Sequence, residues 1–296
     1  MIIFYRIIYN SLSDFHKRIP ANTVTYIGKH PLDPNRILIA RTTSFSILTL
    51  DGQETVLSGQ GQPGYQEGKG RNARYRFISE FLEFSPSSIL ISDKTNTVLR
   101  ILNLTTNQTS RHSGTQSTAG HRDGTRLNAL LSGPHGLVRS IIESFTCYVS
   151  DSVTHKIRRL NSMHLTTVYD GSPMNTPKGM IIHPQTPLQL YVLVDNGIVK
   201  LNLLTLHAIK LNSADNRGFR DGPLGAAKFS MPMNIILVTP NSFLLADYAN
   251  DRLRIWDMEN DTMSSICTGK SVTPSLRHVI SNDIKMRSRH TNDVYY

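Results

Sequence analysis

The stretch FLLADYANDRLRIW, residues 243–256, decides the fold of this 296-residue chain. A short apolar run ends in Asp247, and a second run that carries Arg254 follows after a few polar residues. Both runs are short and contain aromatic residues, and Asp and Asn separate them, which favours two strands and a turn over a helix. The stretch therefore predicts a β-hairpin.

The same pattern recurs along the chain at intervals of 44 to 58 residues. Asp93, Asp151 and Asp195 end the first run of three further copies, and Arg41 takes this place in a degenerate first copy. The copies are ILIARTTSFSILTL (37–50), ILISDKTNTVLRIL (89–102), YVSDSVTHKIRRL (148–160) and YVLVDNGIVKL (191–201). Self-similarity at such a period indicates an array of repeated structural units.

A second element, rich in glycine, precedes three of these copies. Its sequences are GYQEGKGRNARYRF (64–77), GHRDGTRLNALLSGPHGL (120–137) and GFRDGPLGAAKFSMPMNI (218–235). The unit around Asp195 keeps only its tail, TPKGM at residues 176–180, which explains its shorter spacing. We call these three segments the glycine loops.

Each unit holds about four short runs between turn residues, which is the size of one β-propeller blade. The sequence therefore predicts an all-β propeller of four-stranded antiparallel blades, with five complete units. Residues 21–28 are expected to form the outer strand of a sixth blade, so the ring has either five blades plus an N-terminal strand or six blades of which one is incomplete. The predicted organisation is an N-terminal extension (1–19), the propeller (20–270) and a basic tail (271–296).

These residues resemble the NHL-repeat family of propellers. The family pairs a P-x-G-[ILV] element with a later [VI]-x-D-x-x-N-x-x-[IL] element. Pro134 to Leu137 fit the first, and Asp93 with Asn96 and Asp247 with Asn250 fit the second. The resemblance covers roughly residues 20–270 and implies a ring that usually has six blades.

Composition excludes some classes of protein. The net charge is +10, but about half of the excess lies in residues 1–20 and 270–296, so the body of the chain is only mildly basic. Cys147 and Cys267 lie in different units and are expected to be buried thiols, not a disulfide or zinc cluster. No stretch reaches the ~20 apolar residues that span a bilayer.

The compartment stays open at this point. The opening MIIFYRIIYNSL is interrupted by Arg6 and makes a poor signal peptide, so we expect a strand there. N-x-T triplets at Asn103, Asn107 and Asn260 would accept glycans in a secreted protein, but such triplets are frequent by chance. The oligomeric state is open as well.

The repeated Asp residues are structural anchors in this interpretation. Asp93, Asp151, Asp195 and Asp247 recur once per blade, and an Asp at the end of a strand commonly accepts backbone N–H bonds at a turn. A base follows each one: Arg100, Arg158 and Arg254 after seven residues and Lys200 after five. We expect these bases to face outward or to pair within their blade.

The positions of the histidines indicate whether the chain could be a zinc-dependent propeller enzyme. Propellers that are peptidyl-hydroxyglycine amidating lyases resemble this repeat and place three zinc-binding imidazoles after the proline of P-H-G-L. Here His135 occupies one such place, whereas Lys178 and Met233 occupy the equivalents, and one imidazole does not hold a catalytic zinc. His155 lies in a repeat turn and is expected to be structural. The sequence predicts no metal, no cofactor and no catalytic residue.

A basic face is the better candidate for a site. The glycine loops and the turns after the anchors should emerge on one side of the ring and gather eight bases there. These are Lys69, Arg71, Arg74, Arg76, Arg122, Arg126, Arg217 and Arg220. Bases interleaved with Tyr65 and Tyr75 suit a phosphate backbone or an acidic peptide, although Glu67, Asp123 and Asp221 neutralise part of the charge.

The predicted function is that of a non-enzymatic interaction module that presents propeller loops to a partner, with a protein as the first choice. Single-stranded RNA bound by the basic face is the alternative among binding functions. A metal-dependent propeller lyase or lactonase is the alternative from another class.

Overall fold

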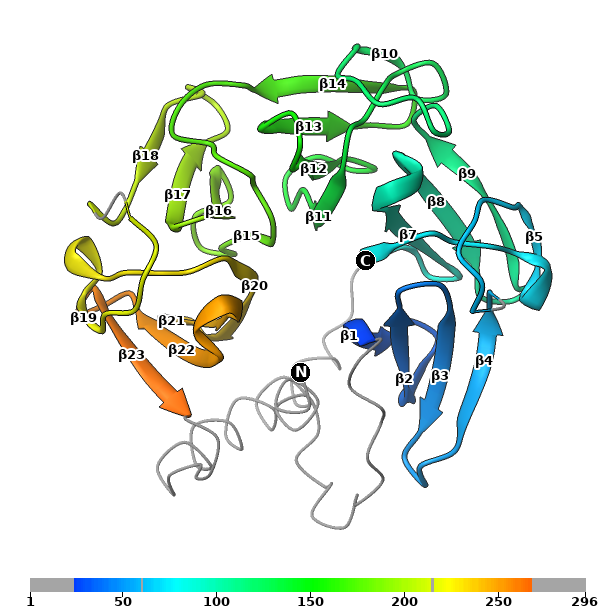
Figure 1. The fold of residues 1–296 in the computed structure, drawn as a ribbon, viewed down its shortest axis with the longest axis horizontal. Helices are drawn as coiled ribbons and strands as arrows, with labels where there is room; N and C mark the ends of the chain where they lie inside the picture. Colours follow the sequence, from blue (N-terminus) through cyan, green and yellow to red (C-terminus); the bar gives the residue numbers. More distant parts are fainter. Residues whose placement is uncertain (1–23, 60, 214–215, 268–296) are drawn as a thin grey trace, which may run out of the picture.

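The computed structural model describes residues 24–59, 61–213 and 216–267, and it confirms the all-β propeller. Five antiparallel sheets follow one another around a common axis (Figure 1). Within the described residues the only helical elements are short 3₁₀ turns, such as Lys94–Asn96 and Tyr248–Asn250. The described part of the chain contains no helix that is long and apolar enough to cross a membrane.

Each sheet is one blade, and the strands follow one another from the axis outward. Blade 1 consists of β1 (Val24–His30), β2 (Asp33–Arg41), β3 (Phe45–Thr49) and β4 (Glu54–Ser58). Blade 2 consists of β6 (Ile78–Ser85), β7 (Ser88–Asp93), β8 (Val98–Asn103) and β9 (Gln108–Ser113). Blade 3 consists of β11 (Pro134–Arg139), β12 (Cys147–Asp151), β13 (Lys156–Leu160) and β14 (His164–Tyr169). Blade 4 consists of β15 (Met180–Ile182), β16 (Gln189–Val194), β17 (Gly197–Asn202) and β18 (Ala208–Lys210). Blade 5 consists of β20 (Pro232–Thr239), β21 (Ser242–Asp247), β22 (Arg252–Asp257) and β23 (Thr262–Cys267).

The strand predicted for a sixth blade belongs elsewhere. β1 pairs with β2, with Ile27 opposite Ile39, and is therefore the innermost strand of blade 1, not the outer strand of another blade. The expectation was wrong because the degenerate first unit has no P-x-G element to mark its inner strand. Figure 1 shows a break between blade 5 and blade 1 in the ring of described strands. The predicted extension (1–19) lies outside the described residues, as does the tail (271–296).

The glycine loops add a fifth strand that the sequence did not predict. Gly68–Lys69 (β5), Gly124–Thr125 (β10) and Gly222–Pro223 (β19) each pair with the outermost strand of the blade that follows. Each loop therefore runs from the outer edge of its blade to the start of the inner strand. Blade 4 lacks the loop, and it lacks this fifth strand as well.

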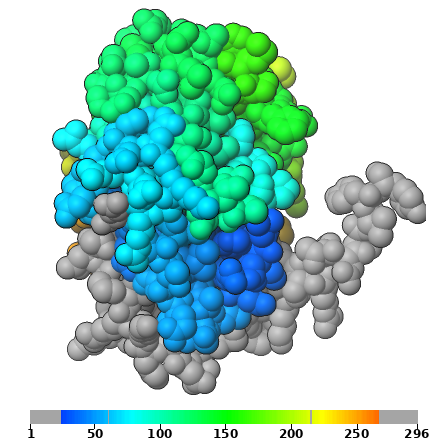
Figure 2. All heavy atoms as spheres, turned by 90° about the vertical axis from the view of Figure 1, so that its right-hand side faces the viewer, coloured from blue at the N-terminus to red at the C-terminus, as the bar shows by residue number. Residues whose placement is uncertain are grey.

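Apolar side chains between neighbouring blades form the core. Phe81 of β6 packs edge-on against Tyr26 of blade 1 and against Phe45, with ring centroids 5.1 and 5.4 Å apart. Tyr191 of blade 4 meets Phe243 and Trp256 of blade 5, each at 5.4 Å. Because each blade buries its faces only against its neighbours, the repeats stabilise one another in sequence. Figure 2 shows the first three blades packed in this order.

Candidate functional site

The glycine loops and the anchor turns lie at one end of the ring, which we call the loop face. Strands alternate in direction from the inner strand outward, so the chain leaves the outer strand of a blade at the end where the next inner strand begins. The second strand ends there too. Side chains join the two kinds of segment, because the Asn96 amide donates to the Gly64 carbonyl and the Asn250 amide donates to the Gly218 carbonyl.

A fully buried arginine supports the loop face in three blades. The side chains of Arg100, Arg158 and Arg254 have no exposed surface, although each carries a charge. They are the bases that follow the anchors by seven residues. Their predicted pairing within the blade is confirmed, and the outward-facing alternative is wrong.

Arg254 has the fullest set of partners. Its Nη1 donates to the anchor Asp247 at 3.0 Å and to the Lys228 carbonyl at 2.6 Å. Its Nη2 donates to the Arg220 carbonyl at 2.6 Å, and the Asp221 carboxylate lies 2.9 Å away. The planar guanidinium therefore joins the anchor turn to the glycine loop at both Arg220 and Lys228, which a lysine could not do.

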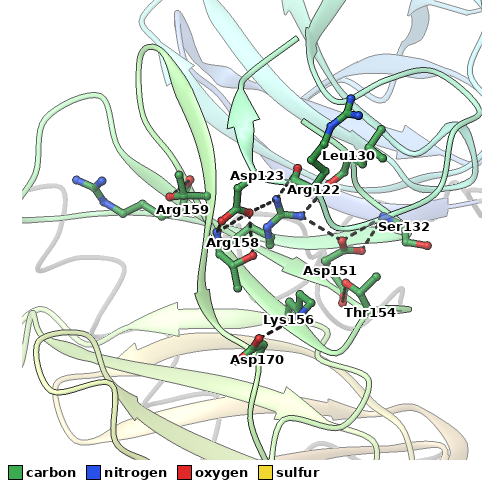
Figure 3. A network of polar contacts seen from close by, with 12 residues as sticks. Arg122, Asp123, Leu130, Ser132, Asp151, Thr154, Lys156, Arg158, Arg159 and Asp170 are labelled. Carbon is green, nitrogen blue, oxygen red and sulfur yellow. Dashed lines mark hydrogen bonds and ion pairs between the residues drawn. The ribbon is translucent and has the colours of Figure 1, made fainter. Parts of the chain in front are cut away.

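The same arrangement recurs in blade 3 (Figure 3). Arg158 lies between Asp123 of the glycine loop, at 2.9 Å, and the anchor Asp151, at 3.7 Å. It also donates to the Leu130 carbonyl at 2.8 Å. Asp123 in turn accepts a hydrogen bond from the backbone N–H of Thr167 on β14, so one carboxylate links the loop to both β13 and β14.

Blade 2 is the variant of this unit. Arg100 donates to the carbonyls of Arg74 and Gln66 at 2.5 and 2.6 Å, but its anchor Asp93 is 3.5 Å away. The residue in the place of Asp123 is Glu67, whose carboxylate accepts a hydrogen bond from the Tyr65 hydroxyl at 2.9 Å instead. Arg100 therefore has one carboxylate partner where the other two arginines have two.

Aromatic residues of the glycine loops cover two of these arginines. The Arg100 guanidinium carbon lies 4.8 Å from the centre of the Tyr65 ring and 4.7 Å from that of Tyr75. Arg254 has Phe219 and Phe229 in the equivalent places, at 5.3 and 4.6 Å. These contacts partly offset the cost of removing a cation from water. The aromatics that alternate with bases in the sequence therefore serve the buried arginines.

The anchor carboxylates Asp93, Asp151 and Asp247 accept backbone N–H groups, but from a different segment than the turn predicted for them. Asp93 accepts from the amide of Arg76 at 3.1 Å, Asp151 from Ser132 at 3.0 Å, and Asp247 from Ser230 at 2.9 Å. These amides belong to the ends of the glycine loops, not to the turn after the anchor. Burial raises the pKa of Asp93 and Asp151, and the hydrogen bonds to their carboxylates oppose that rise.

Blade 4 departs from this arrangement because it lacks the loop. Asp195 is paired with Lys178 at 3.4 Å and with Arg217, which donates through Nε at 2.7 Å. Burial acts to raise the pKa of Asp195, but the hydrogen bonds and charges of Arg217 and Lys178 outweigh it and hold this pKa below its usual value. Lys200 lies on β17 opposite Tyr191 and Ile209 of the flanking strands.

Seven of the eight bases of the predicted face belong to the glycine loops of blades 2, 3 and 5, and Arg217 directly precedes the third of these loops. Arg126 is half-buried and the other seven are exposed. The blade 2 loop carries four of them, Lys69, Arg71, Arg74 and Arg76, against one acid. Lys69 lies at the outer edge on β5, whereas the Arg76 backbone amide contacts the inner anchor Asp93. The bases therefore extend across the width of the loop face.

Some of these bases are engaged within the chain. Arg122 donates to the Asn128 carbonyl at 2.8 Å, Arg126 to the His112 carbonyl at 3.4 Å, and Arg217 to Asp195. Asp123 and Asp221, which were expected to neutralise the surface bases, contact the buried Arg158 and Arg254 instead.

The axial positions hold a different set of side chains. The inner strands of blades 1, 2, 3 and 5 each have a register irregularity near their start, and it falls in the P-H-G-L segment of blade 3. Residues in equivalent places are Thr25, Ser79, His135, Lys178 and Met233. Among the described residues no group of three or more His, Cys, Asp and Glu side chains could hold a metal ion.

Two features of the turns complete the description. His155 accepts a hydrogen bond at Nδ1 from the Thr176 amide at 2.8 Å, which confirms its structural role. The outer hairpins share a motif that the sequence analysis missed, in which the first Asn or Asp accepts amides two and three residues on, as Asn103, Asn202 and Asp257 do. The recurrence of Asn or Asp at the end of the third strand in blades 2, 4 and 5 was the available signal. Cys147 is buried, as expected, and burial raises the pKa of its thiol to about 12.

The comparisons with known proteins show that this chain has the β-propeller fold. No family model and no curated protein matches it. Among solved structures it is similar to a nidogen/laminin complex, at 12% identity over 88% of this chain and 84% of that one, with a TM-score of 0.59.

Two other solved structures share the fold. One is virginiamycin B lyase from Staphylococcus aureus, at 9% identity over 84% of this chain and 85% of that one, with a TM-score of 0.56. The other is an auxiliary nutrient binding protein from Bacteroides ovatus, at 10% identity over 83% of this chain and 57% of that one, with a TM-score of 0.62. At these identities the likeness shows the fold alone.

Proposed function

We propose that this chain is a non-enzymatic interaction module of the NHL-repeat type, which binds an acidic segment of a protein partner on its loop face. The observation that carries the proposal is that the buried bases and the exposed bases have different roles. Buried arginines hold the glycine loops in place from within, and this leaves Arg122, Arg220 and the blade 2 bases exposed on loops that are already ordered.

The aromatic contacts favour a protein over single-stranded RNA. Proteins that bind single strands without sequence preference stack bases on accessible aromatic rings beside a basic groove. Here Tyr75 is buried, and both Tyr75 and Tyr65 contact Arg100. Bases such as Arg71 and Arg220 are exposed to carboxylates of a partner, whereas the Tyr75 ring is buried and the Tyr65 ring already contacts Arg100.

The non-enzymatic part of the proposal rests on the axis. His135 is buried, and its equivalents in blades 4 and 5 are Lys178 and Met233, so the imidazoles that a lyase-type zinc site requires do not converge.

Fluorescence anisotropy with a labelled glutamate-rich peptide and a labelled oligouridine of equal length tests the proposal. The peptide should bind more tightly, and its affinity should fall as salt rises. Replacing Arg122→Gln and Arg220→Gln together should weaken the peptide by about 1–3 kcal/mol, the scale of two charge-assisted hydrogen bonds.

The matched control is the double variant Lys29→Gln with Arg36→Gln, because both residues lie near the β1–β2 turn at the opposite end of blade 1. It should bind as the parent does. Tighter binding of oligouridine would replace the protein partner with RNA. Equal loss of affinity in both double variants would remove the loop face from the function.

A further inference from the structure

Three nitrogen-bearing side chains from three consecutive blades approach one another where the axis meets the loop face. Lys94 begins the 3₁₀ turn after the blade 2 anchor, His135 starts the inner strand of blade 3, and Lys178 precedes that of blade 4. The charges of both lysine ammonium groups act on His135, and the charge of Lys178 also acts on Lys94.

Close contacts between the inner strands fix this cluster. A Cβ on Gly136, the residue after His135, would lie 2.1 Å from the Lys178 carbonyl oxygen, so only glycine permits this approach. The Ser150 hydroxyl donates to that same carbonyl at 2.8 Å and accepts the Gly136 amide at 2.7 Å. On the other side, the Ser79 hydroxyl lies 3.2 Å from the His135 carbonyl. The cluster is therefore held by backbone contacts between blades.

The cluster has more donors than partners. His135 is 5% exposed, and its Nδ1 has no hydrogen-bond partner within the described residues. Lys94 forms no ion pair within them either. Lys178 shares its partner Asp195 with Arg217. A buried polar atom without a partner costs free energy, and so do two partly buried cations that repel each other.

We propose that Lys94, His135 and Lys178 bind one oxyanion, the carboxylate or phosphate group of a small molecule, at the axial end of the loop face. Such a group accepts charge-assisted hydrogen bonds from both ammonium groups and a further hydrogen bond from the imidazole Nδ1–H. This function goes beyond protein binding by the eight bases of the predicted face, since none of the three residues is one of those bases.

The charges around the cluster agree with an anionic ligand. Burial, and after it the charges of Lys94 and Lys178, lower the pKa of His135 to about 3, so its imidazole is neutral and can donate from one nitrogen. Burial also raises the pKa of Glu80, on the neighbouring inner strand, well above its usual value, so this carboxyl does not supply the missing negative charge. Lys94 is only half-buried, whereas His135 and Lys178 are buried.

Calorimetric titration with inorganic phosphate, and separately with citrate, tests the site in the full chain. One equivalent of at least one of the two ions should bind saturably, and the ion that binds identifies the group. Lys94→Met and Lys178→Met should each weaken that binding about tenfold, which corresponds to one charge-assisted hydrogen bond. In ¹⁵N-labelled protein, the ring nitrogens of His135 should shift when the ion binds.

Lys29→Met is the matched control, because it removes a lysine near the far end of an inner strand and should leave the affinity unchanged. Lys94→Met keeps the Asp195 ion pairs, so it tests the site even where Lys178→Met does not fold. Absence of saturable binding of both ions would overturn the proposal, as would equal affinities in Lys94→Met and Lys29→Met. The peptide assay on the glycine loops is independent of either result.

Discussion

Replacing Arg254 should cost more stability than replacing any exposed base in the same blade. In Arg254→Met, the Asp247 carboxylate and the carbonyls of Lys228 and Arg220 lose their donor, while Asp221 is 35% exposed and can turn to water. Breaking a buried ion pair by removing one partner costs about 3–5 kcal/mol, and we expect this range here. Arg254→Lys keeps the charge but cannot reach both carbonyls, so it should cost about 2 kcal/mol.

Urea unfolding followed by Trp256 fluorescence measures these losses, because this single tryptophan is 3% exposed in the core between blades 4 and 5. Circular dichroism recorded in parallel shows whether the other blades unfold in the same transition. Arg220→Met, an exposed control in the same blade, should change the free energy of unfolding by no more than about 0.5 kcal/mol. A loss below about 1 kcal/mol in Arg254→Met would refute the view that this residue holds the loop.

Three further predictions concern buried groups elsewhere. Burial raises the pKa of Glu80 well above 4.5, so the folded state holds a proton that the unfolded chain releases, and stability falls as pH rises through that window. In urea unfolding, Glu80→Gln should therefore raise the free energy of unfolding at pH 7 and hardly change it at pH 4. The exposed control Glu83→Gln should change the free energy of unfolding at neither pH. Equal stability of Glu80→Gln and the parent at pH 7 would count against a buried neutral acid. Burial, and then Arg126, lower the pKa of His112 from 6.5 to about 4, so protonation of the unfolded chain weakens the fold as pH drops through that range, and His112→Gln should flatten this part of a stability–pH curve. Elemental analysis of protein purified without a histidine tag should find no stoichiometric zinc; a tightly held zinc with His135 as ligand would overturn the non-enzymatic proposal.

The repeat predicted the blades because one hairpin pattern occurs at every anchor. Its signal fails where the pattern is incomplete. Blade 1 has Arg41 in place of the anchor and Thr25 in place of the histidine of P-H-G-L, so its inner strand could not be assigned. Short strands such as Gly68–Lys69 pair only through backbone atoms, and they are too short to show the alternation of apolar and polar residues that marks a strand.

The sequence predicts that bases recur at the site but not that some of them are buried, and the reason is physical. A sequence shows that a base recurs at one strand position, but burial depends on what the rest of the blade places around it. Asp123 and Asp221 were assigned to the surface charge, and it is the folded loop that brings them to Arg158 and Arg254. The cluster of Lys94, His135 and Lys178 was beyond prediction, since it depends on how closely the inner strands of neighbouring blades approach one another.

The anchor carboxylates have a consequence for the entropy of binding. The amides of Arg76, Ser132 and Ser230 are each bonded to an anchor buried in the adjoining sheet, so the last residues of every glycine loop lose their freedom when the blade folds. A ligand that meets the loop face encounters segments whose conformational entropy was lost during folding. Its binding energy is then not spent on ordering the loops, and a few exposed arginines can suffice for recognition.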